Sequence, residues 1–231
     1  DTDLNSNFLS TYNLLEAMKL NEVDKILFSS TSAIYGQVDG KIKEDFGPLF
    51  PTSLYGASKL ASEAYISSYC ELFNFQAWIV RFPNVIGDRL THGVIFDFIN
   101  KLKQNPNKLE ILGNGKQKKP YLHVDDLIDG MIKVWETWPN NKKIDIFNIG
   151  PKDDGIFVKE IAQIVSNNFS NNVEIIFGQG NKGWLGDVPK FFYDTNKITD
   201  LTGWSPKMNS KEAIKKSSKQ KNSQLVKKIY L

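Results

Sequence analysis

The chain has 231 residues, of which 41% are hydrophobic, 24% charged and 12% aromatic, with a formal net charge of +3. This composition excludes a disordered chain, a collagen-like repeat and a coiled coil, and the length is ample for a buried core. The single cysteine, Cys70, excludes an internal disulfide framework and favours a reducing compartment. No apolar run approaches the roughly 18 residues of a membrane span, so we expect a cytoplasmic protein without a membrane partner.

The positive charge is concentrated at one end. Residues 211–231 contain seven lysines and one acid, so the rest of the chain has a net charge of −3. A basic segment of this kind can bind nucleic acid, but no arginine-rich or aromatic pattern accompanies it. We therefore expect a solvated basic tail and no nucleic-acid partner.

In chain order, apolar spacing predicts a helix over 4–20, a strand over 25–28, a helix over 53–73, a strand over 77–80, a helix over 94–103, a strand over 109–112, a helix over 125–138, a strand over 144–149, a helix over 158–168 and a strand over 173–177. This alternation predicts an α/β fold with a doubly wound parallel sheet. Ligands of such sheets bind beyond the carboxyl ends of the strands. The segments Ser29–Thr31 and Arg81–Asn84 follow two of these strands, so the chemistry is expected there.

Tyr55 and Lys59 form a Tyr-x-x-x-Lys pair on the helix after the first strand. A spacing of four places both side chains on one helical face. A neighbouring cation stabilises a phenolate and lowers its pKa, which makes the tyrosine a usable acid or base. Tyr193 and Lys197 have the same spacing, but they lie in a late polar stretch and are interpreted as a chance match.

The segments Phe28–Gly36 (FSSTSAIYG) and Pro51–Lys59 (PTSLYGASK) resemble the extended short-chain dehydrogenase/reductase family, and more narrowly its NAD-dependent nucleotide-sugar epimerase/dehydratase group. Further matches follow in family order, at Arg81–Gly87, Gly113–Gly115, Tyr121–Asp126, Phe147–Gly150, Gly186–Pro189 and Gly203–Pro206.

The resemblance implies a Rossmann-like domain over residues 1–90 and a smaller α/β substrate-binding part mainly over 91–210. Within that part, residues of about 120–150 would return to the Rossmann sheet, and 211–231 would form the basic tail. No Gly-x-x-Gly-x-x-Gly motif follows a first strand in this sequence. The family carries this motif on its first β–α turn, which is expected about 80–100 residues before Asn7, in a missing first βαβ region.

By the same resemblance, Thr31 hydrogen-bonds the sugar hydroxyl, Tyr55 is the catalytic acid/base, and Lys59 tunes Tyr55 and holds the nicotinamide ribose of NAD. The remaining NAD contacts are expected at Asn7, Ser29, Ser30 and Pro83. Contacts with a nucleotide-diphosphate sugar are expected at Thr31, Asn84, Ile95, Leu112, Lys119 and Asp187. Lys119 stands where the family usually has an arginine facing phosphate.

The residues after Thr31 separate the members of this group. Dehydratases usually have Asp-Glu there, whereas this chain has Ser32 and Ala33, which favours a 4-epimerase acting through a 4-keto sugar. Leu185 replaces an arginine that is typical of UDP-galactose epimerases, so UDP is the favoured but not the required nucleotide. An NAD(P)-dependent dehydrogenase, reductase or dehydratase and a non-catalytic nucleotide sensor remain alternatives.

Three further expectations complete the interpretation. The two histidines and one cysteine show no metal-ligand spacing, so no metal is expected. The resemblance implies a homodimer in which the helix of Tyr55 packs with the preceding helix against a second subunit. Without the glycine-rich motif, the 231 residues alone are expected to turn over little or no substrate.

Overall fold

The computed structural model describes the chain except for residues 1, 39, 138–141, 171, 181–191 and 230–231, and it describes no side chains from residue 220 onward. The described chain forms two compact units. Unit 1 comprises Asp1–Pro83, Ile128–Gly150 and Phe192–Ser205, and unit 2 comprises Asn84–Leu127, Pro151–Phe191 and Pro206–Leu231. The chain thus leaves unit 1 at residue 83, not at the expected 90, and it returns twice where one return was expected.

Unit 1 contains, in chain order, η1 (Leu4–Leu9, a π-helical stretch), α1 (Ser10–Leu20), β1 (Lys25–Thr31), η2 (Ser32–Tyr35), β2 (Lys41–Ile42), α2 (Leu54–Phe73), β3 (Gln76–Phe82), most of α4 (Val124–Glu136), β8 (Ile144–Asn148), β11 (Phe192–Tyr193) and α6 (Asn196–Thr202). Its main sheet is parallel, in the order β1-β3-β8. The central strand β3 is buried along most of its length, as expected for a parallel sheet covered by helices. The parallel α/β architecture expected from the sequence is confirmed.

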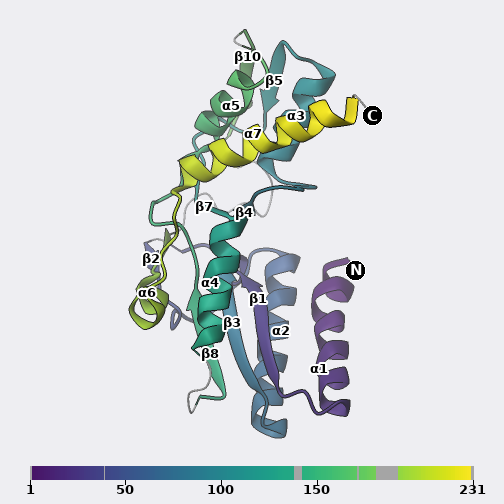
Figure 1. Cartoon of the computed structure of the whole chain (residues 1–231), viewed down its shortest axis with the longest axis vertical. Coiled ribbons are helices and arrows are strands. Elements are labelled where there is room, and N and C mark those ends of the chain that lie inside the picture. The colour runs from purple at the N-terminus through teal and green to yellow at the C-terminus, as the bar shows by residue number, and fades with distance from the viewer. Residues whose placement is uncertain (1, 39, 138–141, 171, 181–191, 230–231) are drawn as a thin grey trace. The chain divides into compact units, whose positions relative to one another are not determined.

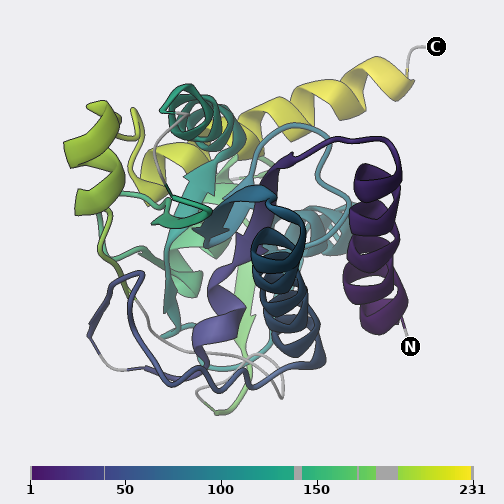
Figure 2. The same ribbon diagram turned by 90° about the horizontal axis from the view of Figure 1, so that it is seen from below.

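Helices α1 and α2 lie side by side (Figures 1 and 2), and α2 packs on β1 and β3. Their shared core contains Leu15, Ile66 and Cys70, all fully buried. The Ser53 side chain caps α2 by accepting a hydrogen bond from the Gly56 amide at 3.1 Å. Glycine is required at position 56 because a Cβ there would lie 2.5 Å from the carbonyl oxygen of Ala33. This close approach holds the first turn of α2 against η2.

Unit 2 contains the remaining elements: β4 (Asn84–Ile86), α3 (Val94–Gln104), β5 (Lys108–Ile111), β6 (Lys118–Lys119), β7 (Tyr121–His123), β9 (Ile156–Phe157), α5 (Val158–Asn167), β10 (Glu174–Phe177) and α7 (Ser210–Ile229). Three short sheets pair β4 with β7, β5 with β10 and β6 with β9. Every helix and strand expected from apolar spacing is present, with ends shifted by a few residues within the described parts of the chain.

The segment expected as a basic tail begins as part of unit 2. Helix α7 packs on α5 and β7, and Ala213 and Ile214 are fully buried in the core of the unit. The side chains of Ala213 and Ile214 face inward while the neighbouring lysines face solvent. The lysine content of the segment therefore did not indicate that one face of this helix is buried. Within the described ranges, no helix combines the length and the hydropathy needed to cross a membrane.

A buried ion pair joins β3 to α2 in unit 1. The Arg81 guanidinium donates two hydrogen bonds to the Glu63 carboxylate, at 3.1 and 2.6 Å, and the two side chains are only 4% and 6% exposed. The Ser30 hydroxyl donates to the same carboxylate at 2.5 Å. The Tyr35 hydroxyl accepts from Arg81 at 3.0 Å. Four elements, β1, η2, α2 and β3, therefore meet at one charged cluster.

Replacing Glu63 by glutamine should strongly destabilise unit 1, because it leaves the buried Arg81 charge uncompensated. We expect Glu63→Gln to lower the free energy of unfolding by ~3–5 kcal/mol. In the matched control, Glu136→Gln removes the exposed partner of Lys133 and should cost at most ~1 kcal/mol. Urea denaturation measures both values, and equal effects of the two substitutions would show that the buried pair has no special role.

Candidate active site

Thr31 and Tyr55 meet at the end of β1. Their side chains are hydrogen-bonded to each other, and the Thr31 oxygen also accepts a hydrogen bond from the backbone amide of Ala33 at 3.2 Å. A hydroxyl has one hydrogen to donate. With the Ala33 amide donating to its oxygen, Thr31 can direct that hydrogen to the Tyr55 oxygen. The structure thus brings together two side chains that lie 24 residues apart in the sequence.

Burial and the Thr31 hydrogen bond act on Tyr55 in opposite directions. Burial raises the pKa of Tyr55 above its ordinary value because it disfavours the charged phenolate, and the hydrogen bond from Thr31 offsets part of that rise. The ring is still 41% exposed, so it is accessible to a ligand. In this structure Tyr55 is therefore a neutral phenol at physiological pH.

Lys59 lies one helical turn beyond Tyr55, and its ammonium is 4.2 Å from the centre of the Phe28 ring. Burial lowers the pKa of Lys59, and the Glu63 charge acts against that decrease. The sequence predicted that Lys59 lowers the pKa of Tyr55. In this structure the ammonium lies on the Phe28 face as a cation–π pair and the net shift of the Tyr55 pKa is upward, so a lowering of the Tyr55 pKa by Lys59 stays a prediction.

The residues expected at NAD have different environments. Ser29 is exposed on β1, and Pro83 is buried at the end of β3. The Asn7 amide donates to the Ser58 hydroxyl at 3.1 Å, which ties η1 to α2. Ser30 is fully buried and donates to Glu63, so its hydroxyl is engaged in the core and not at the surface of the strand. Alternation along a strand explains the difference, since neighbouring side chains point to opposite faces.

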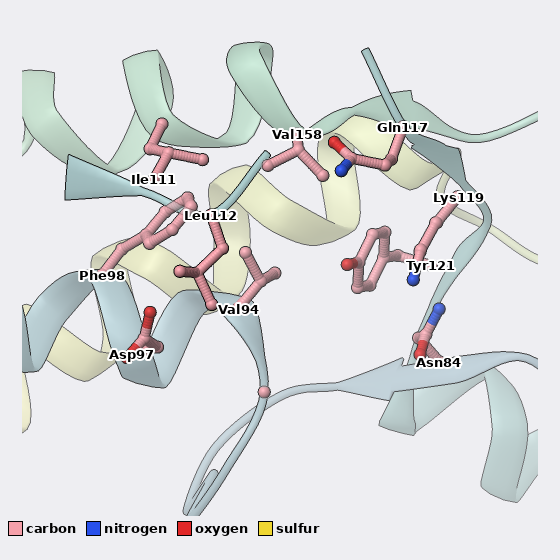
Figure 3. Close-up of a pocket in the computed structure, with 11 residues that line it drawn as sticks. Asn84, Val94, Asp97, Phe98, Ile111, Leu112, Gln117, Lys119, Tyr121 and Val158 are labelled. Atoms are coloured by element: carbon pink, nitrogen blue, oxygen red, sulfur yellow. The ribbon is translucent and has the colours of Figure 1, made fainter. Parts of the chain in front are cut away.

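Unit 2 contains a cavity of about 370 Å³, within the range typical of small-molecule sites. Its lining combines apolar residues with five side chains that carry polar groups, and comprises Asn84, Gly93, Val94, Asp97, Phe98, Ile111, Leu112, Gln117, Lys119, Tyr121 and Val158. Figure 3 shows the Lys119 ammonium and the Asn84 amide directed toward each other at one end of the cavity, with the Tyr121 hydroxyl pointing inward. This arrangement suits a ligand with an anionic end and a flat apolar body.

Three of the sequence-predicted substrate residues, Asn84, Leu112 and Lys119, line this cavity. Ile95 does not line it, because Ile95 is 1% exposed and packs in the core of unit 2, while its neighbour Val94 faces the cavity. Asp187 lies outside the described residues.

The two lysines of β6 point in opposite directions. Lys118 is directed to the ring of Phe157 and to the Asp154 carboxylate, at 3.6 Å, whereas Lys119 lines the cavity. The backbone amide of Val158 donates to the Gln117 carbonyl at 2.9 Å, so the β6–β9 pairing continues one residue before Lys118. Gln117 and Lys119 therefore share the cavity face of this strand.

Sequence analysis missed two groups of residues that shape these sites. Glu63, Arg81 and Tyr35 form the charged cluster behind Thr31, and Gln117 lines the cavity beside Lys119. The sequence did contain an indication of Gln117. It lies two residues before Lys119, and side chains at this spacing on a strand share one face. Glu63 lies four residues after Lys59 on the same face of α2, but its partner Arg81 is on another element. No group of three or more potential metal-ligating side chains occurs in the described part of the chain.

The Tyr193–Lys197 pair has no comparable site. Tyr193 is buried, and the Lys197 ammonium donates to the Asp145 carboxylate at 2.5 Å and to the Ile146 carbonyl at 2.6 Å. Lys197 therefore joins α6 to β8, and Tyr193 is a buried residue of β11; the pair is still interpreted as a chance match.

Sequence comparison relates the chain to nucleotide-sugar enzymes. A model of the NAD dependent epimerase/dehydratase family matches residues 1–150. A putative UDP-glucose 4-epimerase of Methanocaldococcus jannaschii is 32% identical over 215 residues, which cover 91% of this chain and 67% of that protein. The dTDP-D-glucose 4,6-dehydratase of Homo sapiens is 31% identical over 216 residues, covering 91% and 60% respectively. The chain thus spans about three fifths to two thirds of the length of these relatives.

Among solved structures, a crystal structure of UDP-galactose 4-epimerase matches with a TM-score of 0.85 and 36% sequence identity. The match covers 96% of this chain and 71% of that chain. The similarity therefore extends over both units.

Removing the Thr31 hydroxyl should raise the pKa of Tyr55 further, because the hydrogen bond that favours the phenolate is lost. We expect this rise in Thr31→Val, measured by NMR titration of tyrosines labelled at the ring Cζ. The control Thr199→Val removes an exposed hydroxyl that bonds only to the Thr195 carbonyl, and it should leave the Tyr55 titration unchanged. A lower or unchanged Tyr55 pKa in Thr31→Val would show that Thr31 does not donate a hydrogen bond to the Tyr55 oxygen.

Proposed function

The chain belongs to the NAD dependent epimerase/dehydratase family, and we propose that it carries the catalytic and sugar-nucleotide-binding residues of a nucleotide-sugar 4-epimerase. The observation that carries this proposal is the hydrogen-bonded pair of Thr31 and Tyr55, with Lys59 one turn further along α2. Ser32 and Ala33 follow Thr31, so no carboxylate stands there to eliminate water from a sugar.

In the proposed mechanism, Tyr55 accepts the proton of the sugar's 4-hydroxyl and later returns it. Thr31, which lies next to Tyr55 at the end of β1, would hydrogen-bond the same sugar hydroxyl and orient it toward the Tyr55 oxygen. A general acid–base group contributes about 10²–10⁴-fold to a rate when it is within hydrogen-bond reach of the reacting proton. The raised pKa of Tyr55 favours the protonated form, so the group needs a nearby cation to act as a base.

Lys59 supplies that cation in the proposal. Its ammonium is half-buried on Phe28, one turn from Tyr55, and its three donors fit the hydroxyls of a ribose. Together with Tyr55, Lys59 would hold the ribose next to the nicotinamide of NAD. NAD, when bound, supplies a reversible hydride acceptor that allows the sugar's 4-carbon to become a ketone and be reduced again.

The cavity of unit 2 is the proposed site for the nucleotide part of the substrate. Lys119 and Asn84 at one end provide a positive charge and an amide donor for a diphosphate. The apolar walls suit a ribose and base. UDP is the proposed nucleotide, in line with the relatives that are named UDP-glucose and UDP-galactose 4-epimerases.

The activity is proposed for the intact protein, because the chain matches only part of each relative. The 231 residues alone are expected to turn over little or nothing. The homodimer stays a prediction, and the exposed apolar residues Leu4, Leu9, Tyr12 and Tyr65 on the side of η1, α1 and α2 are consistent with it.

A dehydrogenase, reductase or dehydratase of the same family is the alternative function. Net oxidation of the sugar would accumulate one NADH per turnover, whereas an epimerase leaves the amount of oxidised cofactor unchanged. The absence of an acidic pair after Thr31 favours the epimerase over the dehydratase.

Replacing Tyr55 by phenylalanine should remove the proton acceptor without changing the ring that fills its site. In the intact protein, Tyr55→Phe should lower kcat for 4-epimerisation of a UDP-hexose by about 10²–10⁴-fold. Affinity for the UDP-sugar should change little. The control Tyr65→Phe alters an exposed tyrosine on the same helix and should retain activity. Full activity of Tyr55→Phe would refute the proposed acid/base.

The two lysines of β6 offer a matched pair for the nucleotide site. Lys119→Gln should weaken UDP binding by about 10–100-fold, the value of one charge-assisted hydrogen bond. Lys118→Gln removes the same charge from the opposite face, where the partner is Asp154, and should have little effect. Isothermal titration calorimetry of the chain with UDP measures both, and equal losses would indicate only a general charge effect.

A further inference from the structure

Gln117 is a buried amide whose hydrogen-bonding groups are not used within the protein. Its side chain is 3% exposed, and neither Oε1 nor Nε2 has a hydrogen-bond partner among the residues that the structure describes. Asn148 shows the usual situation, since it is fully buried and its amide accepts from the Tyr35 hydroxyl at 2.8 Å and donates to the Ile42 carbonyl at 3.0 Å. A buried amide with both groups unpaired destabilises the folded state. We therefore expect the Gln117 amide to have a hydrogen-bond partner that is not part of the described chain.

The position of Gln117 indicates where that partner binds. Gln117 lines the cavity of unit 2, and Figure 3 shows its amide turned toward Val158 and away from Lys119. Gln117 and Lys119 are separated by one residue on the same face of an extended segment, which places their backbones ~6–7 Å apart. The long side chains diverge from there. The cavity thus offers a cation and an amide at separate positions on one side, and the apolar side chains of Phe98 and Ile111 lie on the opposite side.

A side-chain amide presents one acceptor and two donor hydrogens in a plane. Uracil presents a matching edge, because its N3–H group donates and the adjacent carbonyl oxygen accepts. The apolar residues Val94, Leu112 and Val158 provide surfaces on which a flat ring can pack. A diphosphate at Lys119 and a base at Gln117 fit the two ends of one nucleotide.

We infer that Gln117 recognises the base of the bound nucleotide by pairing its amide with the donor–acceptor edge of uracil. This inference rests on the proposed function, since it assumes that the cavity holds the nucleotide part of the substrate. It assigns Gln117 a specificity-determining role that is separate from the role of Lys119, which acts on the diphosphate. Both Oε1 and Nε2 are buried in this structure, so pairing with the base requires the Gln117 side chain to turn into the cavity.

The test compares UDP with N3-methyl-UDP, in which a methyl group blocks the N3 donor. Isothermal titration calorimetry of the 231-residue chain should show that UDP binds about 10–100-fold tighter than N3-methyl-UDP, the value of one to two buried hydrogen bonds. Gln117→Met keeps the length of the side chain and removes both polar groups. This variant should bind UDP about 10–100-fold more weakly and should bind the two nucleotides equally.

The melting temperature provides an independent readout. Without nucleotide, Gln117→Met should melt at the same temperature as the wild-type chain or higher, because a buried unpaired amide is replaced by an apolar group. A residue with a merely structural role would give a lower melting temperature. Gln117→Glu is a second variant that keeps the shape but lacks the donor, so it should bind UDP more weakly, while its carboxylate can still accept from N3–H and keep the preference for UDP over N3-methyl-UDP. The matched control Gln163→Met changes an exposed glutamine on α5 and should alter neither binding nor its preference.

The outcomes separate this inference from the proposed function. If the wild-type chain does not bind UDP, the nucleotide site and the role of Gln117 both fail. If UDP binds and Lys119→Gln weakens it, but Gln117→Met retains full affinity and preference and Gln117→Glu retains full affinity, only the inference about Gln117 is overturned. Equal binding of UDP and N3-methyl-UDP by the wild-type chain also overturns it.

Discussion

The buried pair of Glu63 and Arg81 is the constraint on which the arrangement of unit 1 depends. Removing two charges from water is costly, and the cost is offset only when the geometry is good and the remaining hydrogen-bonding groups are satisfied. Here Ser30 and Tyr35 complete the hydrogen bonds of the pair. The same contacts fix the end of β1 against α2. Thr31 and Tyr55 meet because this pair and the close approach at Gly56 hold their two elements in one position.

Alternation along extended strands sorts the neighbouring residues of both sites. On β1, the Ser29 side chain is exposed while Ser30 is buried against Glu63. At β6, Lys119 lines the cavity while Lys118 faces Phe157 and Asp154. A run of similar residues therefore divides into residues available to a ligand and residues that stabilise the protein. The pattern of two residues per repeat is the reason, and it applies equally in the two units.

Burial raises the pKa of Tyr55 and lowers that of Lys59, so both shifts disfavour the charged forms. The Lys59 ammonium is placed on Phe28, and Gln117 keeps an unpaired amide at the cavity. The burial of Tyr55 and Lys59 and the unpaired Gln117 amide destabilise the folded state, whereas the cation–π contact of Lys59 with Phe28 is favourable. Functional sites commonly contain groups whose placement lowers the stability of the folded protein.

The sequence by itself determined the family, the order of helices and strands, and the identity of Thr31, Tyr55 and Lys59, because motif spacing and apolar periodicity are local properties. Only the tertiary structure decided which side chains are available. The partner of Glu63 lies on another strand, Ile95 packs in the core while Val94 lines the cavity, and the lysine-rich end starts as a packed helix. These outcomes depend on contacts between residues far apart in the chain, and burial and hydrogen-bond partners are not encoded in any short segment.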